Sequence, residues 1–311
     1  MSSDQRHGTV SVHVAYVMLV TVMMLWASGV IVAKSVAELV PPIGFSFWRW
    51  LCAVSLLTPL AARQALLHWS YIRTRAVQFL LLGLFMAGGS TLLVAAVQHT
   101  TATNVGLVSA AQPMITVVIA WLVLRERVSY GQQIGIAAAA MGIVVMVARM
   151  DMAVIVGLAF NPGDLLVLLA VVFYALYSIN LHRWIAGLPP LLTMYLTAIG
   201  GMLVLLPFYV VESFTVQTFQ WSAPVVAGLL FMALIPTMLA TTMWNISVGV
   251  VGPGRASVFI NLLPIFATLM AVGLLGEHLQ LYHLVGGVLV CAGITLVVRL
   301  QPGRQNDDSG P

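Results

Sequence analysis

Charged side chains are scarce in this chain of 311 residues, which contains 13 Lys or Arg residues and 9 Asp or Glu residues. Charged residues make up 7% of the sequence, against about 25% in ordinary soluble domains, and apolar residues make up 61%. So few charges could not cover the surface of a soluble fold, and so apolar a chain is not disordered. The basic residues are scattered at the ends of apolar runs, so the net charge of +4 does not predict a nucleic-acid partner.

Cysteine is also scarce, and clustered metal ligands are missing. Cys52 and Cys291 are the two cysteines, and both lie in apolar runs, so a disulfide framework is excluded. The seven histidines are dispersed, and none pairs with Cys or a carboxylate at ligand spacing, so we expect no metal site and no other cofactor. The apolar runs lack a nucleophile with its base and lack paired acids, so we predict no catalytic residue. An intramembrane enzyme stays a remote alternative.

Long apolar runs are abundant instead. A helix of about 20 apolar residues crosses a bilayer. Ten such runs occur, at residues 12–33, 43–61, 76–98, 103–123, 130–148, 163–184, 190–211, 223–247, 254–275 and 280–299. They predict an all-α integral membrane protein with ten transmembrane helices, whereas the polar tail 300–311 is predicted to be disordered.

Basic residues in short loops mark the cytoplasmic side of a membrane protein. If the N-terminus is cytoplasmic, the cytoplasmic segments hold ten Lys or Arg residues between Arg6 and Arg304, and the opposite side holds only Lys34 and Arg149. We therefore expect both termini in the cytoplasm.

The two halves of the chain repeat each other at an offset of 151 residues. Four pairs coincide at this offset: Pro113 and Pro264, Glu126 and Glu277, Gly135 and Gly286, and Gly142 and Gly293. Each half holds five spans, an odd number, so the second copy enters the membrane upside down. The sequence therefore predicts two inverted five-helix repeats, residues 12–148 and 163–299, with a binding site between them near the midplane.

Several short motifs resemble those of a known family. They are Trp26-Ala27-Ser28, Gly252-Pro253-Gly254-Arg255-Ala256-Ser257, Leu263-Pro264, and Gly276-Glu277 before a glycine-rich helix. With these motifs the chain resembles the drug/metabolite transporter superfamily in its ten-helix EamA form, and within it the aromatic amino acid exporters. The resemblance covers residues 12–299 and implies a 5+5 inverted repeat, a central cavity, and export of small metabolites across a bacterial inner membrane. Family members commonly carry Trp-Gly where this chain has Trp26-Ala27.

Polar and aromatic residues recur at helical spacing within four runs, which places them on one face of each helix. They are Ser109, Gln112 and Thr116 in the fourth run, Tyr174, Tyr177 and Ser178 in the sixth, Thr237, Thr241 and Trp244 in the eighth, and Ser257, Asn261 and Pro264 in the ninth. These faces predict a cavity between the first, third, fourth, sixth, eighth and ninth spans. The alternative is polar contact between packed helices.

The candidate substrate-binding residues are Trp26, Gln112, Tyr174, Tyr177, Trp244, Asn245, Asn261 and Arg49. Trp244 and Asn245 are adjacent, and neighbours on a helix point about 100° apart, so we favour Trp244, which continues the face of Thr241. Arg49 is the one charge well inside a span. It either binds a substrate carboxylate or reaches the outer headgroups, with Trp48 and Trp50 as interface anchors.

Repeated prolines and glycines indicate how the helices bend and pack. Pro113 and Pro264 each remove one backbone hydrogen bond within a span, and we predict that they are hinges. The glycine faces of the fifth and tenth spans are expected to hold the fourth span to the fifth and the ninth to the tenth. Asn161-Pro162-Gly163-Asp164 has the pattern of a helix N-cap.

Together these features predict a secondary transporter that exports small amphipathic metabolites by alternating access. Aromatic or other large apolar amino acids are the leading substrates, because rings stack on flat side chains and carboxamides bind polar head groups. The alternative is a proton-coupled exporter of lipophilic cations, which needs an acid within the membrane, and none of the nine acids is central. Besides the substrate and membrane lipid we expect no nucleic-acid partner, and we expect a monomeric protein.

Overall fold

In the computed structural model, the described residues are 10–36, 39–96, 99–100, 105, 108–125, 129–157, 161–185, 187–216, 219–275 and 279–299. Helices make up nearly all of this part of the chain, and it contains no strand, so the predicted all-α class is confirmed. Glu126, Glu277 and the tail 300–311 lie outside the described residues.

Nine helices within the described ranges are long and apolar enough to cross a membrane, which makes the chain a multi-pass membrane protein. Six are single helices: α1 (Val12–Val36), α2 (Pro42–Leu67), α8 (Tyr130–Ala148), α10 (Pro162–Trp184), α11 (Pro190–Thr215) and α16 (Leu281–Arg299). Three are composite: α4 (Ala76–Gly83) with η1 (Leu84–Gly88) and α5 (Gly89–Ala96), α12 (Ala223–Met232) with η2 (Ala233–Ala240) and α13 (Thr241–Val251), and α14 (Pro253–Val258) with η3 (Phe259–Leu262) and α15 (Leu263–Leu275).

The fourth predicted span, 103–123, falls partly outside the described residues. Its described part is a shorter apolar helix, Val108–Leu124, which includes α7 (Gln112–Leu124). Two further short helices, α3 (Trp69–Thr74) and α9 (Met152–Val156), lie between spans. The inverted order of two five-helix repeats stays a prediction.

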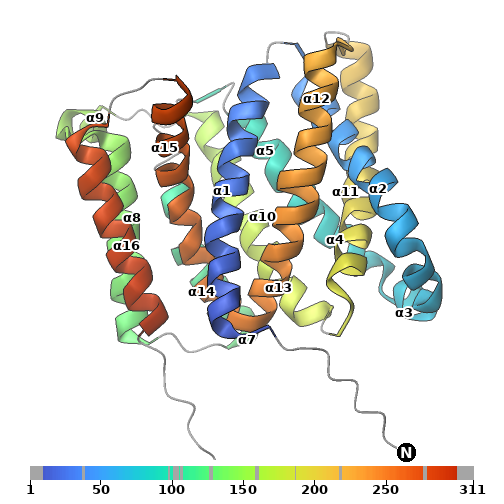
Figure 1. Ribbon diagram of the computed structural model, residues 1–311, viewed down its shortest axis with the longest axis horizontal. Helices are drawn as coiled ribbons and strands as arrows, with labels where there is room; N and C mark the ends of the chain where they lie inside the picture. The colour runs from blue at the N-terminus through green and yellow to red at the C-terminus, as the bar shows by residue number, and fades with distance from the viewer. Residues whose placement is uncertain are drawn as a thin grey trace, which may run out of the picture.

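The helices form one bundle around a shared apolar core. Figure 1 shows α8 and α16 side by side at one edge, α2 and α11 together at the other, and α1 between them. Buried side chains from both edges and the centre, including Leu19, Trp50, Leu192 and Val290, belong to one contiguous cluster. Both halves of the sequence therefore contribute to the same core.

The start of α10 is fixed by the predicted N-cap. The Asn161 side chain accepts a hydrogen bond from the Asp164 backbone N–H at 3.3 Å, and the Asp164 carboxylate accepts one from the Asn161 N–H at 2.9 Å. This reciprocal pair is a capping box, so the predicted cap is confirmed. Thr100 also donates to the Asp164 carboxylate at 2.5 Å, which ties the end of the third span to α10.

A buried acid on another helix caps α2. Glu212, near the end of α11, is 6% exposed and accepts hydrogen bonds from the backbone N–H groups of Ile43 at 3.1 Å and Gly44 at 2.5 Å. The first N–H groups of a helix have no partner within it, and its positive dipole end favours a carboxylate. Glu212 therefore joins α2 to α11.

The third and eighth spans each contain a π-helical segment. η1 interrupts the third span, and η2, which contains Pro236, interrupts the eighth. Shifted by the repeat offset, Leu84–Gly88 falls on residues 235–239, inside η2. Such segments widen a helix by one residue per turn and often lie at functional sites.

Both predicted hinge prolines follow a break in their helices. Pro113 is the second residue of α7, which begins after a turn at Ala111, and Pro264 is the second residue of α15, which follows the 3₁₀ segment η3. A proline at this position loses no helical hydrogen bond, because the first turn has no donor partner anyway. Their role as hinges stays a prediction.

The glycine faces pack the fifth span on the tenth. A Cβ on Gly142 would lie 2.6 Å from the carbonyl oxygen of Gly286, and one on Gly135 would lie 2.7 Å from that of Gly293. The expectation that these glycines hold the fourth span to the fifth and the ninth to the tenth is wrong, because they let α8 and α16 touch backbone to backbone. The crossed pairing is the pattern that a twofold axis between antiparallel helices produces.

Candidate functional site

A cavity of about 250 Å³ lies between the two halves of the bundle. This volume lies just below the range of about 300–1,000 Å³ that is typical of small-molecule sites, so the cavity suits a ligand at the small end of that range. We call the residues that line it the cavity wall. They come from α1, α2, the composite third span, the fourth span, α10, the composite eighth span and the segment around η3 and α15. The second span thus joins the six that the sequence predicts.

Two tryptophans form an aromatic part of the wall. The rings of Trp26 and Trp244 lie 5.3 Å apart between centroids with a tilt of 40°. The Trp26 Nε1 donates to the carbonyl oxygen of Pro236 at 3.1 Å, and the Trp244 Nε1 donates to the Ser178 hydroxyl at 3.3 Å. Both indole N–H groups are thus satisfied by the protein, which leaves the rings to contact a ligand.

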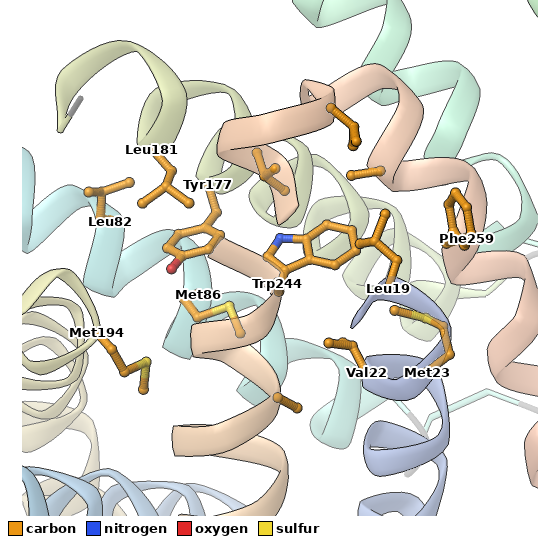
Figure 2. Packing of buried hydrophobic residues seen from close by; sticks show 14 of the residues in the cluster. Leu19, Val22, Met23, Leu82, Met86, Tyr177, Leu181, Met194, Trp244 and Phe259 are labelled. Carbon is orange, nitrogen blue, oxygen red and sulfur yellow. The ribbon is translucent and has the colours of Figure 1, made fainter. Parts of the chain in front are cut away.

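Two tyrosines of α10 continue the wall. The Tyr177 hydroxyl donates to the Asn245 Oδ1 at 2.8 Å, and Figure 2 shows its ring beside Trp244. The Tyr174 ring packs on the backbone of the third span, where a Cβ on Gly89 would lie 3.3 Å from it. Asn245 lies behind the wall and holds Tyr177 in place.

Arg49 supplies the one charge on the wall as the described residues define it. Its Nη2 donates to the Ser90 hydroxyl at 2.9 Å, and its Cζ lies 5.6 Å from the centroid of the Trp50 ring. The side chain therefore points into the bundle rather than to the outer headgroups. Trp50 is 1% exposed, so it is not the interface anchor that the sequence suggests.

The structure brings most predicted site residues together. Six of the eight candidates are on the wall: Trp26, Arg49, Gln112, Tyr174, Tyr177 and Trp244. Asn245 and Asn261 are not; Asn261 is 2% exposed and packs within η3. Binding of substrate by any of them stays a prediction.

Trp50, Ser90 and Pro236 are wall residues that the sequence reasoning misses. Each carries a signal in the sequence. Ser90 follows two glycines in the middle of an apolar run, Pro236 is a further proline within a span, and Trp50 adjoins the one intramembrane arginine. None of these signals tells which way the side chain faces.

The cavity extends from the middle of the bundle toward one end. Its α1 wall residues, from Trp26 to Ala33, belong to the C-terminal half of that helix. Near the start of α1, the rings of Tyr16 and Phe259 stack at 5.5 Å, and Ser247 donates to the Ala15 carbonyl at 3.2 Å. These contacts join α1 to the eighth and ninth spans below the cavity.

Comparison with known proteins agrees with this architecture. The model of the EamA-like transporter family matches residues 13–148 and again 161–299. The uncharacterized transporter YyaM of Bacillus subtilis (strain 168) is 24% identical over 280 residues, which cover 90% of this chain and 92% of that protein. The "Probable terminal-alkyne amino-acid exporter" of Streptantibioticus cattleyicolor is 27% identical over 68% of this chain and 69% of that protein. A solved crystal structure with 16% identity covers 91% of this chain and 95% of its own, with a TM-score of 0.76.

Proposed function

Because the chain belongs to the EamA-like transporter family, we propose that it is a secondary transporter that exports small amphipathic metabolites, foremost aromatic or other large apolar amino acids. The resemblance to aromatic amino acid exporters supports the direction and the substrate. A relative that bears the name of an amino-acid exporter supports them as well.

The observation that carries the proposal is a cationic cavity with aromatic walls. Arg49 can hold a carboxylate through charge-assisted hydrogen bonds, and the paired rings of Trp26 and Trp244 offer a stacking surface for a flat side chain. Tyr174 and Gln112 offer further hydrogen-bonding groups. An ammonium group would have only neutral oxygens and ring faces to contact.

The same wall disfavours the alternative of a proton-coupled exporter of lipophilic cations. Such an exporter needs an acid that binds either a proton or the cation. The wall residues include no Asp or Glu within the described part of the chain, and their one charge is positive. A lipophilic cation would be repelled by Arg49.

We further propose that the protein works as a monomer in a bacterial inner membrane with both termini in the cytoplasm. With this orientation the cavity extends from the middle of the bundle toward its outer end, and the Tyr16–Phe259 stack lies on the cytoplasmic side of it. Labelling of single cysteines at Asp4 and Gln305 with an impermeant reagent tests the orientation. Labelling of either site from outside intact cells would contradict it.

The decisive experiment is transport in proteoliposomes that contain the purified full-length chain. Phenylalanine, serine and a tetraphenylphosphonium cation are compared, each with and without a pH gradient, against protein-free vesicles. We expect carrier-dependent flux of phenylalanine in both conditions, slower flux of serine, and none of the cation. Flux of the cation alone, or phenylalanine flux that requires the pH gradient at a fixed proton stoichiometry, would overturn the proposal.

A further inference from the structure

We propose that Arg49 and Trp50 form an anion subsite, oriented by Ser90, through which the cavity selects aromatic carboxylates of net negative charge over zwitterionic amino acids. This inference rests on the proposed function, because it concerns the same cavity and ranks aromatic monocarboxylates above amino acids among its small amphipathic substrates. The favoured ligands are aromatic acids whose α-carbon carries hydrogen, a hydroxyl or an oxo group in place of the ammonium.

The first support is the way in which Arg49 is held. Ser90 donates its own hydroxyl proton to the Ala87 carbonyl at 2.9 Å, so its oxygen is free to accept from the Arg49 Nη2 at 2.9 Å. One corner of the guanidinium is thereby fixed, with the Trp50 ring alongside it. Ser90 is a positioning residue, since its only proton is used by the backbone.

The second support is a pair of buried donors without partners. The Nε of Arg49 and the Nε1 of Trp50 are both buried, and neither has a hydrogen-bond partner among the described residues. Buried polar groups are nearly always hydrogen bonded, because an unmade bond is costly. Eight such atoms occur among the described residues, and Arg49 and Trp50 are the two of these residues that belong to the cavity wall, where a carboxylate that reached them could offer its two oxygens as acceptors.

The third support is the charge of the site. Within the described part of the chain, Arg49 has no ion pair and no acid is on the wall. A cation within a membrane is usually paired or faces a polar cavity. A monocarboxylate neutralises Arg49, whereas a zwitterion leaves the net charge unchanged and adds a second cation two bonds from the carboxylate. Desolvating that ammonium without an acidic partner is unfavourable.

The test uses the full-length protein in detergent at pH 7.5 and titration calorimetry with three ligands that share a phenylethyl group. These ligands are 3-phenyllactate, phenylalanine and phenethylamine, which carry net charges of about −1, 0 and +1 because carboxyl groups titrate near pH 4 and amines well above pH 7. We expect 3-phenyllactate to bind about tenfold more tightly than phenylalanine and phenethylamine not to bind.

Substitutions then assign the donors. Arg49→Gln should weaken 3-phenyllactate binding about tenfold or more, and Arg49→Lys should recover part of the loss. Trp50→Phe keeps an aromatic ring but removes the indole N–H, and should weaken 3-phenyllactate binding several-fold. Arg63→Gln, an exposed arginine on the same helix, is the matched control and should change nothing. Thermal unfolding of each variant checks that it folds.

The outcomes separate the two proposals. Tighter binding of phenylalanine than of 3-phenyllactate to the unsubstituted protein would overturn the charge selection while leaving the proposed amino acid transport intact. An unchanged affinity in Trp50→Phe and Arg49→Gln would overturn the subsite. Binding of neither acid, together with no flux in vesicles, would overturn the proposed function itself. The comparison of the three ligands uses the unsubstituted protein, so it tests the charge selection even if Arg49→Gln fails to fold.

Discussion

Trp244 is the residue at which the cavity wall meets the packed core. It is 3% exposed, its ring lies against Trp26, and Figure 2 shows it between Tyr177 and Leu19. A stacked ring contributes about 0.5–1.5 kcal/mol beyond its buried area. Trp244→Ala should therefore weaken transport of an aromatic substrate about 2- to 10-fold.

Flux assays with two substrates check this prediction. Serine transport should fall less than phenylalanine transport, because serine has no ring to stack. Trp244→Phe, which keeps a ring and loses the bond to Ser178, is the control and should retain most of the aromatic preference. Equal losses for both substrates in a correctly inserted Trp244→Ala would indicate a packing role.

Helical spacing alone places Gln112, Tyr174, Tyr177 and Trp244 on polar or aromatic faces of their helices, and the structure has all four on one wall. Spacing identifies which residues share a face, but the direction of that face depends on neighbouring helices. Asn245 is one residue from Trp244, yet it bonds Tyr177 behind the wall. Whether a residue faces the cavity or lies behind it is decided by contacts between helices, and the sequence of a single apolar run does not specify these contacts.

Among the elements, the α7 and α15 helices each begin one residue before a proline and after a break. If these breaks are hinges of alternating access, Pro113→Ala and Pro264→Ala should each slow transport several-fold. Their unfolding midpoints should move by no more than about 2–4 °C, the shift expected for about 1 kcal/mol. Flux and thermal unfolding, measured on the same preparations, test both parts.

Pro59 provides the matched control for the hinge prolines. It lies inside α2, is exposed, and is absent from the cavity wall. Pro59→Ala should leave the transport rate unchanged. Normal rates in both hinge variants, with normal insertion, would remove the basis for the hinges.

The contact between α8 and α16 predicts a stability effect. Gly142→Ala would place a methyl group 2.6 Å from the Gly286 carbonyl oxygen, and such overpacking typically costs about 1–3 kcal/mol. Its unfolding midpoint should fall by several degrees. Gly249→Ala is the control, since its added Cβ meets nothing within 4 Å and alanine favours a helix. Equal midpoints would show that α8 and α16 separate easily.

Span positions follow from apolar length, so most elements are predictable from the sequence. Three kinds of feature are not. The π segments depend on how a helix fits its neighbours, the cap on α2 comes from Glu212 in a distant span, and the glycine faces have no mark that names their partner. In each case the sequence pattern fits more than one neighbouring helix, and the packing of the whole bundle decides which one makes the contact.

At the scale of the whole molecule, the repeat offset read from the sequence recurs in the fold. It relates η1 to η2, Pro113 to Pro264, and the crossed glycine contacts of α8 and α16. The cavity takes its wall from both halves, with Arg49 from the first and Trp244 from the second. Movement of one half against the other would therefore open the site to either end of the bundle.

Arg49, the one charged residue on the cavity wall as the described residues define it, also bears on how the transporter would respond to voltage. A cell interior is electrically negative, and moving one elementary charge across the membrane is worth about 2.3 kcal/mol per 100 mV. The membrane potential alone would thus drive export of a monoanion, without exchange for a proton. At equilibrium the concentration of the anion outside the cell would exceed that inside by roughly 50-fold per 100 mV. In vesicles with a valinomycin-clamped potassium gradient, a positive lumen should speed uptake of 3-phenyllactate and leave that of phenylalanine unchanged. An anion flux indifferent to voltage would mean that another charge crosses with it.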